Sequence, residues 1–386
     1  MRGKLLFVAL SGFAVSAVCL GGAFALNGNA VGGAMFDFGG LPACGPAGST
    51  ATSRTLAWDG GEDRVAVAVA ANSYYRPGNG DQLVIKGDPR IISHVYVRDG
   101  VVGIDCNPGG FFFGRSERIE LTLPGRKFRT FELRGSGDMR LAELAQPEAQ
   151  ILIKGSGDVQ SDGKIDRLAV EIHGSGDMTA SGTTDALNVD IRGSGNAKLG
   201  GLTVKSADVR VDGSGDVEIA PRDAASVSIV SNGSGDIDAA GSSDSLKLAM
   251  HGSGDARLGG LAVKNAEVRI AGSGDAEVAP SQSLNAGIAG SGDVQLRTEP
   301  AKLDASISGS GEIIHPDGTR QDRHHFSQRH ARLEDREFKA AMRDETARGH
   351  DGSDEDLERA QAGLEARIKA RVARELDRAG VGPDTD

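Results

Sequence analysis

Aromatic side chains are missing from the middle of this 386-residue chain, where no Phe, Tyr or Trp lies between Gly135 and Ile314. The apolar residues of that stretch are Ile, Val, Leu, Met and Ala, which predict a narrow aliphatic core. The stretch also offers no aromatic platform on which a sugar ring could stack.

Cysteine is scarce as well, and basic residues are outnumbered by acidic ones. The formal net charge is −11 and no basic stripe is present, which argues against a nucleic-acid partner. Cys19 follows Val18, where a lipoprotein signal has a small residue, so we do not interpret it as a lipid anchor. Cys44 and Cys106 could pair in an exported protein or remain free thiols, because sequence alone does not supply the geometry of a disulfide.

Glycine is abundant instead, with 56 residues, and much of it lies in the tetrapeptide Gly-Ser-Gly-Asp. The tetrapeptide or a close variant occurs ten times at a nearly constant interval, which is typical of stacked coils. The repeats begin at Gly135, Gly155, Gly174, Gly193, Gly213, Gly233, Gly252, Gly272, Gly290 and Gly309. The fourth place holds Asp138, Asp158, Asp177, Asp216, Asp236, Asp255, Asp275 and Asp293, with Asn196 and Glu312 as the exceptions.

The residues beside the tetrapeptide alternate between apolar and polar, as in Phe131 and Leu133 before it and Val217-Glu218-Ile219 after it. Alternation with a period of two predicts β-strands with one buried face and argues against helices. We therefore expect each coil to contain a strand, a tight Gly-Ser-Gly-Asp corner, a second strand and a looser connection. The glycines suit positive φ or a close approach of neighbouring coils.

The polar position two residues after each corner can be followed from coil to coil, because stacking places equivalent residues about 4.8 Å apart. No three successive members share a sign of charge, which predicts a solvated and mildly self-attracting face. This polar column consists of Arg140, Gln160, Thr179, Lys198, Glu218, Asp238, Arg257, Glu277 and Gln295.

A longer repeat relates GSGNAKLGGLTVK, which begins at Gly193, to GSGDARLGGLAVK, which begins at Gly252. The offset between the two segments equals three coils and indicates duplication of a three-coil block. A solenoid tolerates such a duplication because the local packing of each coil is unchanged.

The recurring carboxylates are the sharpest chemical feature. Neighbours about 4.8 Å apart repel by about 1 kcal/mol in water-like surroundings, so something must offset their charge. We interpret them as a structural turn ladder, in which each Asp caps N–H groups of its own turn. The ladder includes Gly135, Asp138, Gly155, Asp158, Gly174, Asp177, Gly213 and Asp216.

Calcium is the weaker alternative for the eight aspartates, because the known calcium solenoid motif has a nine-residue period that this chain lacks. We expect no cofactor. Compensating positive charge is also available just before the early corners, at Arg134, Lys154, His173 and Arg192.

Residues 1–25 are typical of an export signal, with Arg2 and Lys4, an apolar run from Leu5 to Leu20, and the cleavage pattern Ala23-Phe24-Ala25. An uncleaved membrane anchor is the alternative. Either way we expect a protein of the periplasm or cell surface, which would contact a membrane only if these residues are not cleaved.

The next two segments precede the repeats. Residues 26–50 are rich in Gly and Ala and are interpreted as a linker. Residues 51–118 are interpreted as an N-terminal β cap that covers the first coil and contributes its first strands. Within this segment Arg98-Asp99-Gly100 lies between two short strands and indicates a hairpin.

The segments 118–124 (RIELTLP) and 131–138 (FELRGSGD) resemble the GIN-domain family, described as the head domain of auto-transporter adhesins. The likeness extends back through 80–85 and 99–102 and covers roughly residues 52–315. It implies an exported bacterial protein with a right-handed parallel β-helix and no established enzymatic activity. We therefore expect an all-β solenoid over positions 119–315, in which each coil takes up roughly 19–20 residues.

Residues 316–386 change composition to Glu, Asp, Arg and Ala and predict a charged helical tail. One helix is expected from about Arg320 to Arg348 and a second from Ser353 to near Gly380. The second helix would carry one apolar stripe, which could support self-association through 353–380 or fold back on the solenoid. The remaining alternative is a solvated appendage. The stripe consists of Leu357, Leu364, Ile368, Val372 and Leu376. His324, His325 and His330 do not share a helix face, which argues against a metal site.

No catalytic constellation is present in the sequence. The carboxylates are spread evenly, one per coil, rather than gathered in one cleft with a basic residue. We therefore expect a non-catalytic envelope or cell-surface module that binds or scaffolds an envelope protein or glycan. A polysaccharide-active β-helix enzyme is the alternative.

Overall fold

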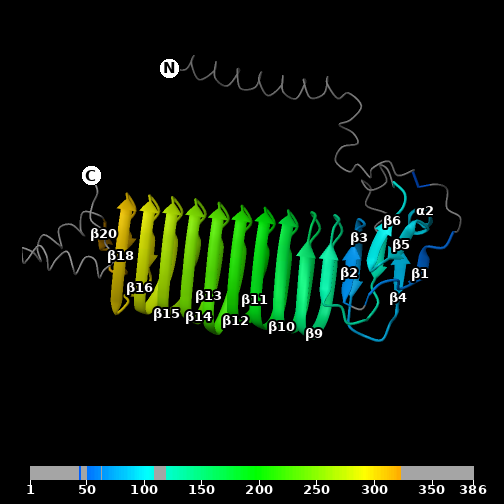
Figure 1. The fold of residues 1–386 in the computed structure, drawn as a ribbon, viewed down its shortest axis with the longest axis horizontal. Helices are drawn as coiled ribbons and strands as arrows, with labels where there is room; N and C mark the ends of the chain where they lie inside the picture. The colour runs from blue at the N-terminus through cyan, green and yellow to red at the C-terminus, as the bar shows by residue number, and fades with distance from the viewer. Residues whose placement is uncertain (1–42, 45–49, 62, 108–118, 323–386) are drawn as a thin grey trace, which may run out of the picture.

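Parallel strands stacked in one row make up most of the molecule (Figure 1). The computed structural model describes residues 43–44, 50–61, 63–107 and 119–322. The strands of these ranges belong to one sheet, and from Met139 onward the chain coils as a β-solenoid. Equivalent corner residues of neighbouring coils lie 18, 19 or 20 positions apart in the sequence. The expected all-β solenoid is thus confirmed.

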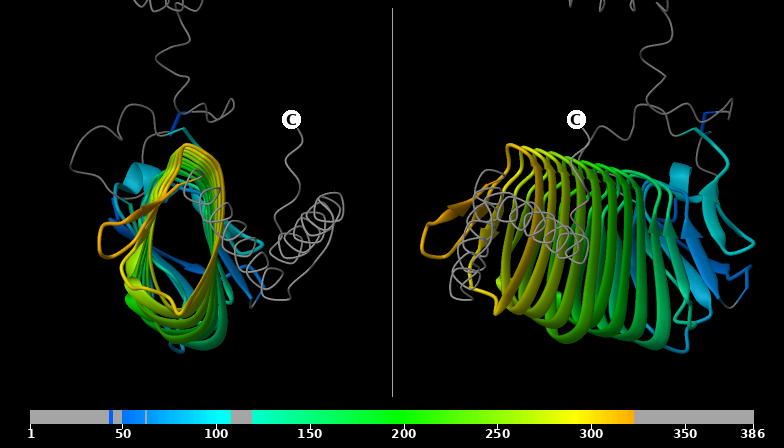
Figure 2. Two further views of the ribbon diagram at one scale, coloured as in Figure 1. Left: turned by 90° about the vertical axis from the view of Figure 1, so that its left-hand side faces the viewer. Right: turned by 60° about the vertical axis from the view of Figure 1, so that its left-hand side comes forward.

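Each coil is built mainly from one long strand that wraps around the core, and not from two strands and a looser connection. The segment expected to be loose remains paired with the next coil, with register shifts such as that between Thr179 and Ser181. Viewed along the stack, the coils superpose as a flattened ring (Figure 2). The strands are β9 (Met139–Ile153), β10 (Val159–Gly174), β11 (Met178–Gly193), β12 (Ala197–Gly213), β13 (Val217–Gly233), β14 (Ile237–Gly252), β15 (Ala256–Gly272) and β16 (Ala276–Gly290).

The corners bring the backbones of successive coils into direct contact. A Cβ atom added to the second glycine of the corners from Gly157 onward would lie 1.9–2.2 Å from the carbonyl oxygen of its equivalent in the preceding coil. The first glycine combines a similar approach with positive φ, as at Gly233, where φ is 151°. Glycine is therefore required at both places, for closeness and for conformation.

The inward positions of the strands form aliphatic columns, as the alternation predicts. Ile172 lies beside Ile191, which lies beside Val211, and all three are fully buried. The two three-coil blocks also share a backbone irregularity, since the register shifts after Leu199 in the first and after Leu258 in the second. The duplication is therefore visible in the backbone as well as in the amino-acid sequence.

The chain before the first corner mixes antiparallel and parallel pairs. β1 pairs with β4 and β4 with β7 in antiparallel fashion, whereas β2 runs parallel to β8 and β3 runs parallel to β9 of the solenoid. The expected hairpin is confirmed as β5–β6, with positive φ at Asp99 (52°) and Gly100 (75°). A short helix, α2 (Pro89–Ile92), was not predicted. The strands are β1 (Ser53–Ala57), β2 (Arg64–Val67), β3 (Ala71–Tyr75), β4 (Gln82–Lys86), β5 (Val95–Arg98), β6 (Val101–Ile104), β7 (Ile119–Thr122) and β8 (Thr130–Leu133).

Four aromatic side chains fill the core at this end of the solenoid. Phe128 packs against Trp58, Tyr75 and Phe131 at centroid distances of 5.3, 5.7 and 6.2 Å. The Tyr75 hydroxyl donates to the carbonyl of Arg126 at 2.6 Å. The aromatic residues that the coils lack are thus concentrated where the first coil meets the preceding strands.

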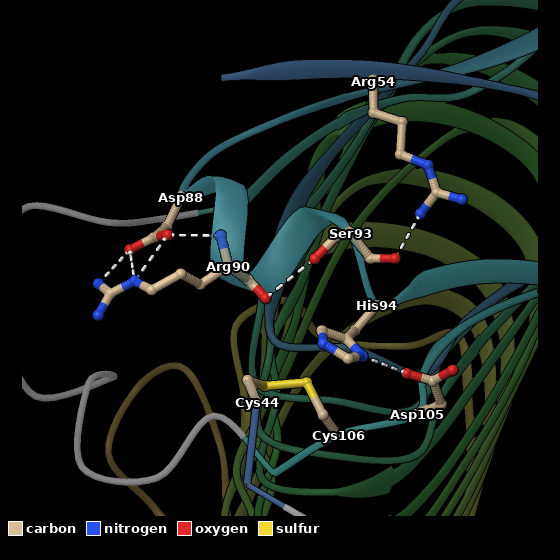
Figure 3. The surroundings of a disulfide bond; sticks show 8 residues. All are labelled: Cys44, Arg54, Asp88, Arg90, Ser93, His94, Asp105 and Cys106. Atoms are coloured by element: carbon tan, nitrogen blue, oxygen red, sulfur yellow. Dashed lines mark hydrogen bonds and ion pairs between the residues drawn. A yellow bond between two sulfur atoms is a disulfide. The ribbon is translucent and has the colours of Figure 1, made fainter. Parts of the chain in front are cut away.

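A disulfide joins Cys44 to Cys106 beside β6, with the Cα atoms 4.9 Å apart (Figure 3). The Cys44 N–H also donates to the carbonyl of Asn107 at 3.0 Å. The cross-link spans 62 residues, and a loop of that length constrains the unfolded chain by about 4 kcal/mol in the chain-entropy treatment.

The far end of the solenoid finishes in a hairpin, so the chain is extended at Arg320–Gln321, where we expected the first tail helix to begin. The rest of that predicted helix lies outside the described residues. β17 (Val294–Leu296) and β18 (Lys302–Gly309) complete the last coil, and β19 (Ile313–Ile314) pairs antiparallel with β20 (Arg320–Gln321). Asp317 accepts a hydrogen bond from the N–H of Thr319 at 2.9 Å, which stabilises the turn between β19 and β20. Residues expected to start a helix therefore extend the sheet.

Several predictions concern residues outside the described ranges, including the export signal, the histidines from His324 onward and the apolar stripe of the tail. No helix in the described part of the chain is both long and apolar enough to cross a bilayer.

Replacing Gly235 by Ala should destabilise the protein by about 2 kcal/mol or more, because the new Cβ would lie 2.1 Å from the carbonyl oxygen of Gly215. Gly287 is the matched control, since a Cβ there would meet nothing nearer than Arg269 Cγ at 3.9 Å. Thermal unfolding followed by circular dichroism should show a lowered Tm for G235A and little change for G287A. Equal Tm values for both variants would contradict the close-contact explanation.

Candidate functional site: the carboxylate ladder and the Tyr74 groove

The aspartates of the corners bond to the next coil, which corrects the prediction that each caps its own turn. Asp158 Oδ1 accepts from the N–H of Asp177 at 2.8 Å, and Asp216 Oδ1 accepts from the N–H of Asp236 at 2.8 Å. The same bond recurs from Asp138, where it is 3.4 Å, to Asp293. Each carboxylate is therefore stabilised by a backbone dipole of the next coil.

The two exceptions in the ladder follow from this bond. Asn196 Oδ1 accepts from the N–H of Asp216 at 2.9 Å, because an amide oxygen serves as well as a carboxylate oxygen. Glu312 occupies the last corner, where no further coil follows among the described residues. Its side chain pairs instead with Arg320 of β20, with an N–O distance of 2.8 Å.

The cations before the early corners do not neutralise the ladder as expected. Arg134 and Lys154 pair with Glu132, and Arg192 pairs with Asp190. Among the described residues, Arg257 contacts an aspartate of the ladder and lies 2.8 Å from Asp236. The hydrogen bond from the N–H of Asp255 holds the pKa of Asp236 below its ordinary value, and Arg257 lowers this pKa further. Both together outweigh burial, which would raise it.

Glu132 is the centre of a charge cluster that the sequence did not indicate. Its side chain is only 1% exposed and pairs with Arg64 of β2, with Arg134 at 2.7 Å and with Lys154 at 3.0 Å. Burial alone would raise the pKa of this carboxyl, but hydrogen bonds from the three cations outweigh burial and lower the pKa to about 2. The cluster joins the strands before the first corner to the solenoid.

A shallow groove of about 460 Å³ lies just past the first corners, at the same end of the solenoid. β3 runs parallel to the start of β9 and places Tyr74 opposite Arg140. The polar column predicted from the sequence is confirmed, since Arg140 lies opposite Gln160, and Gln160 opposite Thr179. The groove is lined by Asn72, Ser73, Tyr74, Asp138, Met139, Arg140, Asp158, Val159, Gln160 and Thr179.

The groove offers an aromatic ring beside hydrogen-bonding groups of several kinds. Tyr74 is 44% exposed and is the one large apolar side chain exposed among the described residues. Arg140 donates to the Gln160 side-chain oxygen at 3.1 Å, which orients both. Asp138 and Asp158 against Arg140 give the lining a net charge of −1 (−2 + 1). Such a surface suits a polar ligand with an apolar face.

The sequence predicted no aromatic side chain for sugar stacking along the repeats. This expectation fails at the first coil, where the exposed ring of Tyr74 lies opposite Arg140. Tyr74 and Arg140 are far apart in the sequence, and β3 takes the place of a preceding coil. In the structure Ala71, Ser73 and Tyr75 are buried and Tyr74 is exposed, but the sequence does not reveal which strand β3 pairs with.

A catalytic or metal centre is not favoured by the described side chains. Asp138 and Asp158 are exposed and engaged by backbone N–H groups, as at most other corners, so nothing distinguishes a catalytic acid from its partner. His94, Asp105 and Cys106 lie close together, but Cys106 is in a disulfide and is not a thiolate ligand.

The structure is thus a β-solenoid with a polar groove at one end. Residues 63–234 and 220–300 match the family described as "Putative auto-transporter adhesin, head GIN domain", and these ranges span more than half of the chain. The protein therefore belongs to the GIN-domain family, and the resemblance noted in the sequence is confirmed.

Solved structures similar to this chain include two proteins from Parabacteroides distasonis and one from Bacteroides fragilis. One from P. distasonis, described as a putative lipid binding protein, has 21% identity and a TM-score of 0.38 and covers 70% of this chain and 98% of its own. A putative adhesin from P. distasonis has 16% identity and a TM-score of 0.40, covering 68% and 96%. A putative adhesin from B. fragilis has 20% identity and a TM-score of 0.29, covering 68% and 95%. No curated protein matches the chain.

Removing one acceptor from the ladder should lower stability, whereas exchanging it for an amide should not. We expect D216A to cost about 1 kcal/mol, because the N–H of Asp236 loses its partner, and D216N to cost less than half of that. Urea unfolding in the presence of EDTA and again with millimolar Ca²⁺ measures both effects. A large calcium-dependent rise in stability would favour the calcium alternative instead.

The Glu132 cluster should make stability depend on pH in the acid range. The pKa is lowered on folding, so the stabilisation is complete above the unfolded value near 4.5 and is lost as pH falls toward 2. The loss is at most about 3 kcal/mol, since the cations are half-exposed and solvent screens them.

This pH effect can be measured by comparing wild type with E132Q from pH 6 to pH 2. E132Q should be less stable at pH 6, and the difference should shrink toward pH 2. E148Q is the control, because Glu148 pairs with Arg167 at 3.6 Å on the surface and should change little. A difference between wild type and E132Q that is constant with pH would contradict the assignment.

Proposed function

We propose that this protein is a non-catalytic, adhesin-like binding module of the bacterial envelope or cell surface, and that the Tyr74 groove is its binding site. The observation that carries the proposal is the exposed Tyr74 ring at the head of a polar column that otherwise presents only hydrophilic side chains. Exposed aromatic residues surrounded by polar groups are typical of binding surfaces. The description of the family as an adhesin head domain supports the proposal of a binding module.

Export is part of the proposal and has two kinds of support. Residues 1–25 carry the sequence features of an export signal or anchor. The Cys44–Cys106 disulfide fits an oxidising compartment such as the periplasm or cell surface. N-terminal sequencing of the mature protein distinguishes a cleaved signal, which would leave Leu26 first, from an anchor.

We also propose that the solenoid is right-handed and that residues 51–118 act as its N-terminal cap. The cap is supported by the strands β1 to β6, which precede the first coil, and by the rings of Trp58 and Tyr75, which pack against Phe128 in the core. A polysaccharide-active enzyme is less well supported, because the described carboxylates repeat evenly along the ladder.

Binding can be tested with the labelled full-length protein and envelope fractions of the bacterium that produces it. Y74A and R140A should each weaken the apparent affinity by about fivefold, the effect of roughly 1 kcal/mol at an interface residue. K198A is the control, because Lys198 belongs to the same column but lies outside the groove. The proposal fails if wild-type protein does not bind, or if K198A is as defective as the groove variants.

A further inference from the structure

We infer that the Tyr74 groove binds a neutral saccharide, with one pyranose ring stacked on Tyr74 and the next units lying along Arg140, Gln160 and Thr179. The inference rests on the proposed binding function and names the ligand class for the same site. It is carried by the position of the exposed ring at the end of a straight polar row.

The spacing of the row fits a linear oligosaccharide. Tyr74, Arg140, Gln160 and Thr179 are successive neighbours in parallel strands, so the row advances by about 4.8 Å per step and spans roughly 14 Å. A pyranose unit in an extended chain advances by a similar step. Up to four sugar units would therefore meet one side chain of the row each.

The groups along the groove match the hydroxyls of a sugar. Asp138 and Asp158 are acceptors, Arg140 is a donor, and Gln160 and Thr179 are both. Sugar hydroxyls donate and accept in the same way, while the C–H face of a pyranose ring is apolar and suits an aromatic surface. The single exposed ring and the mixed polar row therefore correspond to the two kinds of surface on one ligand.

The charge of the groove and its shape narrow the ligand class. A net charge of −1 from the lining disfavours uronic-acid or sulfated glycans. A peptide would need pockets for its apolar anchors, but Met139 and Val159 are turned into the core and buried. The groove is thus better suited to a neutral glycan than to an acidic glycan or a protein segment.

The test is an array of neutral and acidic glycans probed with the full-length protein, followed by calorimetry on the strongest neutral ligand. We expect Y74A to bind at least tenfold more weakly and Y74F to stay within about twofold, because phenylalanine keeps the ring. Q160A should weaken binding, and Q295A is its control, being the same substitution in the same column outside the groove. Absence of any neutral glycan ligand, or equal affinity of Y74A and wild type, overturns the inference.

Treated envelopes separate this inference from the proposed function. Periodate cleaves the vicinal diols of glycans, and protease removes exposed proteins. Binding that is lost after periodate and survives protease supports a saccharide ligand. Binding that survives periodate and is lost after protease overturns the saccharide while leaving a binding module in place, and absence of binding to untreated envelopes removes both.

Discussion

The close contact between successive corners is the constraint on which the rest of the structure depends. At each corner the backbone of one coil lies against that of the coil before it, so closely that a Cβ atom would not fit at the second glycine. This approach keeps long strands of neighbouring coils in register and aligns aliphatic side chains in columns. It also places each ladder carboxylate within reach of the next N–H group, and that bond stabilises the stack on its outer edge.

Much of the architecture was predictable because it depends on local spacing. Corners that return at a nearly constant interval, with alternating flanks, determine the stacking, the inward columns and the polar column, all of which the register reproduces. The direction of the Asp bond was not predictable, because an N–H of the same turn and one of the next coil are equally compatible with the repeat. The wrap-around strands were missed for a related reason, since irregular bulges such as that after Leu199 weaken the alternation without ending the pairing.

The groove and the Glu132 cluster depend on contacts that repetition does not encode. Both bring residues before the first corner against the first coils: Tyr74 meets Arg140, and Arg64 meets Glu132. In sequence Glu132 is one polar residue in an alternating strand and gives no sign that its side chain is buried among three cations. The candidate site therefore lies where the periodic part of the chain meets the non-periodic part, which is also where sequence reasoning has least information.

The ladder has a further consequence for how such a protein can change length. Every coil carries one acceptor for the coil after it and one N–H donor for the coil before it, so an inserted coil completes both bonds with its new neighbours. The three-coil block repeated from Gly252 would lengthen the molecule by about 14 Å while leaving the groove and the terminal hairpin unaltered. The repeat number thus acts as a ruler that separates the two ends, adjustable by duplication without redesign of either.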